Sequence, residues 1–199
     1  MLLLIDNYDS FTYNLYQEIG KLTEQEIRVV KNDQVTEADL NNPEVTGLIL
    51  SPGPGSPEKA GRMNEMLEKA IGQMPVLGIC LGHQAIGQVY GGKISLAPLM
   101  HGRTSMVTVE SKDGQTSGIF ADCPEEFVVG RYHSLMIDPE TLPDNLAVTA
   151  TAADGTIQAV ADEENRVYGL EFHPESIMTD QVVAKQIFEN FIQMTERTK

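Results

Sequence analysis

The sequence of 199 residues is poor in basic residues, in cysteine and in long apolar segments. Its 14 Lys and Arg residues are outnumbered by 29 Asp and Glu residues, which gives a formal net charge of −15. This excess of negative charge argues against binding to nucleic acid or to an anionic membrane surface. No apolar run approaches the roughly 20 residues that a transmembrane helix needs. We therefore expect neither nucleic acid nor a membrane as a partner, and we attribute the acidity to solubility.

The two cysteines are Cys80 and Cys123. They do not make a disulfide framework, and the sequence has no Cys-x-x-Cys pair. Residues 1–5 are apolar, but the run ends at Asp6 and lacks a basic segment before it, which favours a strand over a signal peptide. These features predict a reducing, cytoplasmic setting.

Two common kinds of binding site are also missing. The loop at residues 51–55 lacks the Gly-x-x-x-x-Gly-Lys-[Ser/Thr] pattern, and its prolines remove the amide donors that a phosphate cradle requires. Such a rigid loop could instead present one amide N–H, such as that of Gly53, to a developing oxyanion. The sequence has no His-Glu-x-x-His motif and no cysteine–histidine cluster, so we expect no metal site.

What the sequence does contain is an alternation of short apolar strands and helices in its first half. Strands are expected at residues 2–5, 27–30, 47–50 and 75–79, with one helix capped by Ser10 and another opened by Pro57. The second half has short β-branched strands separated by turns, followed by a helix at about residues 180–194.

This pattern predicts an α/β fold. We expect an open, mostly parallel twisted sheet with helices on both faces, and an antiparallel β region in the second half. Because we find no linker and no internal repeat, residues 1–199 are expected to form one domain. Ligands of such sheets bind beyond the carboxyl ends of the strands.

The segment around Cys80 has the form of a nucleophile elbow, with Gly78 before it and Gly82 after it. Glycine is needed on both sides because a strand that turns sharply into a helix leaves no room for larger neighbours. At a helix N-terminus the thiolate would be favoured, and the amide of Leu81 would be free to bind an oxyanion. The alternative is that Cys80 is a small buried apolar residue, as most free cysteines are.

A cysteine nucleophile needs a base, and the base needs an orienting group. His173 follows an expected strand, and Glu175 lies two residues further, where its carboxylate can turn back onto the imidazole. The alternative is a surface turn with a capping glutamate. Three other histidines compete for this role: His83, His101 and His133. His83 lies in the helix after the elbow, where its side chain is expected to point away from Cys80.

Taken together, these motifs resemble the class I (triad) glutamine amidotransferases, whose fold is flavodoxin-like. The resemblance is carried by Gly78-x-Cys80-x-Gly82-x-Gln84, by Ser51-Pro52-Gly53-Pro54-Gly55 and by His173-Pro174-Glu175. Residues 6–15, 100–103 and 131–135 resemble more specifically the amidotransferase subunits of anthranilate synthase and aminodeoxychorismate synthase. The resemblance covers the whole chain in order, with one departure, Arg103, where lysine is expected.

The resemblance implies that glutamine is the substrate, Cys80 the nucleophile, His173 the base and acid, and Glu175 the group that orients it. The amides of Gly53 and Leu81 would form the oxyanion hole. The residues expected to hold glutamine are Gly53, Pro54, Gly55, Gln84, Ser134 and Leu135. Glutamine would be hydrolysed through a glutamyl thioester to glutamate and ammonia, with no cofactor in this subunit.

The resemblance also implies a partner, a chorismate-binding synthase subunit that needs magnesium and uses the ammonia. Its product would be anthranilate, for tryptophan, or 4-amino-4-deoxychorismate, for folate. We expect the contacts to involve residues 7–11 and the region near His101.

Three alternatives remain open. A γ-glutamyl hydrolase or a small peptidase of similar fold would share Cys80 and His173, and would act without a partner. A second alternative is an amidotransferase for another acceptor, such as GMP or carbamoyl-phosphate synthesis. A third is a binding or regulatory module that has lost catalysis, although the intact set of Cys80, His173 and Glu175 argues against it.

Overall fold

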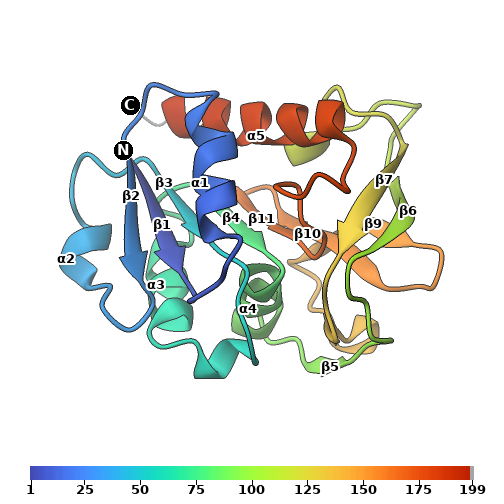
Figure 1. Cartoon of the computed structure of the whole chain (residues 1–199), viewed down its shortest axis with the longest axis horizontal. Coiled ribbons are helices and arrows are strands. Elements are labelled where there is room, and N and C mark those ends of the chain that lie inside the picture. Colours follow the sequence, from blue (N-terminus) through green and yellow to red (C-terminus); the bar gives the residue numbers. More distant parts are fainter. Residues whose placement is uncertain (198–199) are drawn as a thin grey trace.

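The computed structural model describes residues 1–197 and contains one large sheet with helices on both sides (Figure 1). The strand order in this sheet is β2-β1-β3-β4-β11-β10-β9-β6-β7. The strands are β1 (Leu2–Asp6), β2 (Ile27–Lys31), β3 (Gly47–Leu50), β4 (Val76–Ile79), β6 (Arg103–Val109), β7 (Glu126–Arg131), β9 (Ala147–Ala152), β10 (Ile157–Asp162) and β11 (Val167–Leu170). A small antiparallel sheet consists of β5 (Ile94–Leu96) and β8 (Leu135–Ile137).

The direction of the strands changes once across the large sheet. From β2 to β11 neighbouring strands are parallel. From β11 to β7 they are antiparallel. The predicted α/β fold with an antiparallel region from the second half is therefore confirmed. Strand β11 belongs to both parts, since it pairs with β10 on one side and with β4 on the other.

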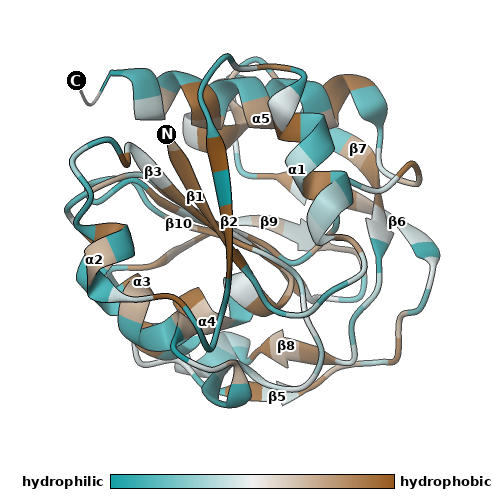
Figure 2. Ribbon diagram, turned by 60° about the vertical axis from the view of Figure 1, so that its left-hand side comes forward, coloured by the Kyte–Doolittle hydropathy of each residue, from teal (hydrophilic) through white to brown (hydrophobic). Residues whose placement is uncertain are grey.

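The helices cover both faces of the sheet, as predicted. Helices α1 (Thr12–Gly20) and α5 (Gln181–Glu196) lie on one face, and α3 (Met63–Ala70) and α4 (Leu81–Val89) on the other, with the short α2 (Glu37–Leu40) beside α3 (Figures 1 and 2). Strand β1 shows why its sequence is apolar throughout: Leu2 and Leu4 enter one core, and Leu3 and Ile5 enter the other. Within residues 1–197, no helix combines the length and the apolar composition needed to cross a membrane.

Two expected helix starts are wrong. Ser10 does not cap α1, because the amide of Phe11 donates to Asp9 Oδ2 at 2.8 Å and Asp6 Oδ1 accepts from the Thr12 hydroxyl at 2.9 Å. The two aspartates thus provide the local acceptors that Ser10 was expected to supply. Pro57 opens a short 3₁₀ turn, and the α-helix that follows begins only at Met63.

Strand β4 and helix α4 are packed as closely as their backbones allow. A Cβ at Gly78 would lie 2.5 Å from the carbonyl carbon and oxygen of Gly82. A Cβ at Gly82 would lie 2.6 Å from the Cβ and the carbonyl oxygen of Leu50 on β3. The two glycines that flank Cys80 are therefore required by close backbone contact, and they fix where the helix leaves the sheet.

We predict that Gly78→Ala destabilises the protein by about 1–3 kcal/mol, because backbone atoms must move to admit the methyl group. Urea unfolding followed by circular dichroism measures this loss. The matched control is Gly20→Ala, where the new methyl would meet only Ile27 Cδ1, at 3.9 Å. The control should leave stability unchanged or slightly raised, and an equal loss in both variants would contradict the packing argument.

Candidate active site

The predicted elbow is present at Cys80. Strand β4 ends at Ile79, α4 begins at Leu81, and Cys80 between them has φ 50° and ψ −99°. A positive φ is strained for a residue other than glycine, and such strain is concentrated at functional sites. The Cys80 amide donates to the carbonyl of Leu170 at 2.8 Å, which anchors the elbow to β11.

The pairing of β4 with β11 brings the end of the chain to this elbow. Leu170 is the partner of Ile79 in the parallel ladder, so Glu171 follows β11 at the level where Cys80 follows β4. His173 comes two residues later, and its amide donates to the carbonyl of Gly130 at 3.1 Å. Cysteine and histidine thus lie at the same carboxyl edge of the sheet, on neighbouring strands.

His173 is held by a carboxylate. Its Nδ1 lies 2.6 Å from Glu175 Oε1, and both side chains are buried. Because a carboxylate can only accept, Nδ1 carries the hydrogen and Nε2 is left as the basic nitrogen. Nε2 is buried and has no hydrogen-bond partner among the described residues. The imidazole is also packed between Tyr132, with ring centroids 5.1 Å apart, and Phe11, at 5.7 Å.

A cavity of about 190 Å³ opens in front of the thiol. It is below the roughly 300–1,000 Å³ typical of drug-sized ligand pockets, which suits a ligand the size of an amino acid. It is lined by Gly53, Pro54, Gly55, Cys80, Gln84, Tyr132, His133, Ser134 and Leu135. The structure thus brings every residue expected to hold glutamine to one cavity with Cys80, whereas His173 and Glu175 do not line it.

The loop that carries Gly53 is supported by Asn7. The Asn7 side chain donates to the carbonyl of Ser51 at 2.8 Å and accepts from Asn32 at 3.0 Å. A Cβ at Gly53 would lie 2.6 Å from Asn7 Cβ and 2.8 Å from Leu81 Cδ2, so the loop lies directly against the elbow. Asn7 was expected at a partner surface, but only 2% of it is exposed. Its position is that of a support for the loop.

The electrostatics of the thiol differ from the expectation. Burial raises the pKa of Cys80 well above its ordinary value, and the nearby carboxyl groups of Glu171, Glu175 and Asp9 raise it further. The start of helix α4 was expected to favour the thiolate, whereas burial and three acidic neighbours oppose it. The thiol is therefore protonated in the free protein, and a nearby base is needed to ionise it.

Sequence analysis missed a second buried network, in which His133 is neutral. Burial lowers its pKa to about 4. Its Nε2 accepts from Arg131 at 3.1 Å, and its Nδ1–H donates to the carbonyl of Leu135 at 2.9 Å. Arg131 in turn pairs with Asp154 at 2.9 Å. His133 thus fixes the backbone that lines the cavity, although it is not held by a carboxylate as His173 is.

The two remaining histidines are not placed as bases. His83 is fully buried against Gly169, with neither ring nitrogen bonded to a described residue, and burial lowers its pKa to about 3. His101 is exposed, and its ring lies 6.2 Å from that of Tyr132.

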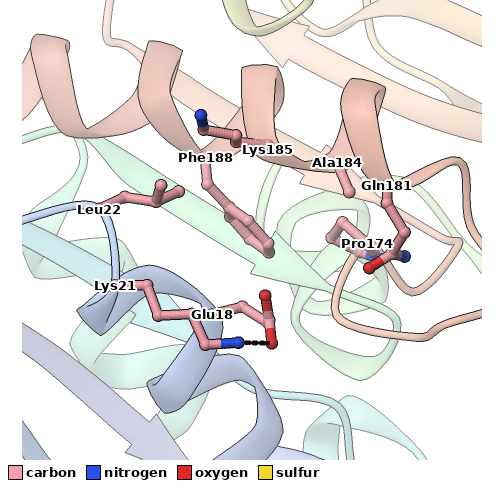
Figure 3. A pocket seen from close by; sticks show the side chains of 8 residues that line it. All are labelled: Glu18, Lys21, Leu22, Pro174, Gln181, Ala184, Lys185 and Phe188. Atoms are coloured by element: carbon pink, nitrogen blue, oxygen red, sulfur yellow. Dashed lines mark hydrogen bonds and ion pairs between the residues drawn. The ribbon is translucent and has the colours of Figure 1, made fainter.

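Outside the cavity at Cys80, the part of the chain that the structure describes offers no metal site. No group of three or more His, Cys, Asp or Glu side chains there could hold a metal ion. A cavity of about 280 Å³ lies between α1 and α5, with Phe188, Leu22 and Pro174 as its apolar walls (Figure 3). Its rim carries an ion pair of Lys21 with Glu18 at 2.6 Å, but no thiol and no imidazole.

Comparison with known proteins agrees with this geometry. The family model for class-I glutamine amidotransferases matches residues 3–194. Anthranilate synthase component 2 of Lactococcus lactis subsp. lactis is 46% identical, over 100% of this chain and 97% of the relative. Aminodeoxychorismate/anthranilate synthase component 2 of Bacillus subtilis is 45% identical, over 97% of this chain and 96% of the relative. Aminodeoxychorismate synthase component 2 of Klebsiella aerogenes is 44% identical, over 96% of this chain and 99% of the relative.

Among solved structures, a protein of Thermoplasma acidophilum named as part of a GMP synthase superposes with a TM-score of 0.84 at 26% identity, covering 98% of this chain and 94% of that chain. Since the family match extends over nearly the whole sequence, the chain belongs to the class-I glutamine amidotransferase family.

Proposed function

We propose that this chain is the subunit that hydrolyses glutamine and supplies ammonia to a chorismate-using synthase. The observation that carries the proposal is the buried His173–Glu175 pair, held on the strand next to the Cys80 elbow. The curated relatives that span almost the full chain are named as component 2 of anthranilate synthase, of aminodeoxychorismate synthase or of both.

The proposed reaction begins with transfer of the Cys80 proton to Nε2 of His173. Glu175, bonded to Nδ1, stabilises the imidazolium that forms. The thiolate attacks the side-chain amide carbon of glutamine, and the amides of Gly53 and Leu81 stabilise the oxyanion. His173 then protonates the departing nitrogen, which leaves as ammonia and a glutamyl thioester.

The second half of the reaction frees the enzyme. Water attacks the thioester carbonyl and gives one proton to His173, which again acts as the base. The intermediate collapses to glutamate and releases Cys80, which recovers its proton from the imidazolium. During both halves, Gln84, the loop at residues 53–55 and the backbone of Ser134 and Leu135 hold the substrate, since all of them line the cavity.

The ammonia must pass directly to a partner, because in bulk water it would be protonated and lost as a nucleophile. We propose that the partner is the chorismate-binding synthase subunit, which brings the magnesium that its own reaction needs. Tyr8 and Ser10 are exposed beside the site, as is His101, and we assign the contact to them. A cytoplasmic location is part of the proposal, since both cysteines are free thiols.

Cys80→Ser tests the proposal in the complex reconstituted with each synthase subunit. We expect glutamine-dependent synthesis to fall by about 10³-fold or more, because a serine hydroxyl is a much weaker nucleophile than a thiol. Synthesis from added ammonium salts should continue at the wild-type rate. Identifying the aromatic product with each synthase distinguishes the tryptophan route from the folate route.

The matched control is Cys123→Ser, a buried thiol remote from the cavity, which should leave both activities unchanged. Loss of the ammonium-dependent reaction in Cys80→Ser would contradict the assignment. Full glutaminase activity of the isolated wild-type chain would favour a hydrolase instead.

Glu175→Gln tests the role of the orienting carboxylate. The amide can still bond to Nδ1, but it removes the charge that stabilises the imidazolium, so we expect kcat for glutamine hydrolysis to fall by about 10²–10⁴-fold. Steady-state kinetics in the complex measures this change. The control is Glu163→Gln, which alters an exposed carboxylate bonded to Tyr168. A Glu175→Gln enzyme within threefold of wild type would show that the pair is only structural.

A further inference from the structure

Glu171 is a fully buried carboxyl group that the reaction described above does not use. It follows β11, beside the elbow, where the Cys80 thiol hydrogen-bonds to it, and burial raises the pKa of its carboxyl group well above the ordinary value. The side chain of Gln84 bonds to it: Nε2 lies 3.0 Å from Oε1 and 3.2 Å from Oε2. The imidazole of His133 is also near, with its Nδ1 3.9 Å from Glu171 Oε1. A carboxyl group buried without a close cation is costly, so its position calls for an explanation.

The contact with Glu171 fixes which way the Gln84 amide faces. Nε2 donates to the Glu171 carboxyl group and also approaches the Leu135 carbonyl, at 3.3 Å, so its two hydrogens are both directed to protein acceptors. The oxygen of a terminal amide lies on the other side of its carbon. None of the described residues bonds to Gln84 Oε1. If this atom were buried, it would therefore be among the buried polar atoms without a partner, and it is not. Oε1 is therefore accessible, and Gln84 lines the cavity.

We propose that Glu171 is a positioning residue that turns the carbonyl oxygen of Gln84 toward the cavity, where it accepts a hydrogen bond from a donor group of the substrate. The inference rests on the proposed function, because it takes glutamine as the ligand. Glutamine carries an ammonium and an amide NH₂, and both are donors that need an acceptor. If the Gln84 amide were reversed, its NH₂ would meet these donors, and neither could accept.

Two groups with fixed positions orient the amide of Gln84. Leu135 O already accepts from His133 at 2.9 Å, which fixes one side of the Gln84 nitrogen. Glu171 provides the other side, and its own amide is tied to the carbonyl of Gln158 at 2.8 Å. The amide of Gln84 is thus oriented from two independent backbone segments, and its direction does not depend on the ligand.

The test measures kcat and KM for glutamine in the complex with the synthase, at saturating chorismate. Glu171→Leu should raise KM about tenfold or more, because Gln84 holds a part of the substrate that does not react, whereas a change in kcat would report the lost contact with the Cys80 thiol. Glu171→Gln keeps an acceptor oxygen for Gln84, so its KM should stay within threefold of wild type.

Control variants separate this role from a structural one. Asp162→Leu and Asp162→Asn change another buried carboxyl group. Asp162 pairs with Val167, at the end of β11 opposite to Glu171, so KM for glutamine should not change in either variant. In a Gln84→Leu background, Glu171→Leu should cause no further rise in KM, since its effect passes through Gln84. An independent rise in that background would overturn the inference.

A second pair of variants decides the question if Glu171→Leu does not fold. Gln84→Glu alone places two carboxyl groups together and should raise KM. Adding Glu171→Gln restores a donor–acceptor pair with an oxygen facing the cavity, so KM should recover by about tenfold. An unimproved double variant would overturn the inference. A wild-type complex without glutamine-dependent synthesis would instead defeat the proposed function itself.

Discussion

The parallel pairing of β4 with β11 is the interaction on which the site depends. It aligns Ile79 with Leu170, and the bond from the Cys80 amide to the Leu170 carbonyl extends the ladder into the elbow. Strand β11 has its other neighbour in the antiparallel part of the sheet, so the change of strand direction occurs beside the nucleophile. This ladder brings Cys80 and His173, which are far apart in the sequence, to the same edge of the sheet.

The acidity of the chain has a local consequence at this edge. Three carboxyl groups, those of Glu171, Glu175 and Asp9, raise the pKa of the Cys80 thiol beyond the effect of burial. A protonated thiol is a poor nucleophile, so the free protein is protected from unwanted reactions of a thiolate. A base at the same edge of the sheet is therefore needed to ionise it, and His173, with its Nε2 free of partners among the described residues, is the candidate.

The sequence allowed prediction of what is local. The spacing of Gly78, Cys80 and Gly82 predicts the elbow, because backbone crowding acts between neighbouring residues, and apolar alternation predicts most of the strands and helices. The sequence did not reveal the pKa shifts at the site, because these depend on groups that the sheet brings together. The raised pKa of Cys80 comes from burial and from carboxyl groups of separate segments, and the lowered pKa of His133 comes mainly from burial in the folded protein. Ser10 was wrongly expected to cap α1 because Asp9 accepts from the amide of Phe11 and Asp6 from the hydroxyl of Thr12.

The N-terminal segment shows why a motif that looks like a partner surface is also part of the site. Asn7 is buried and supports the loop of Gly53, whereas Phe11 packs against the ring of His173. Between them Tyr8 has φ 60° and is 53% exposed. The segment therefore runs from the loop of Gly53 to the ring of His173, with Tyr8 exposed between them. One short turn, with a positive φ at Tyr8, thus connects an exposed side chain to the two neighbours that support the Gly53 loop and the His173 ring.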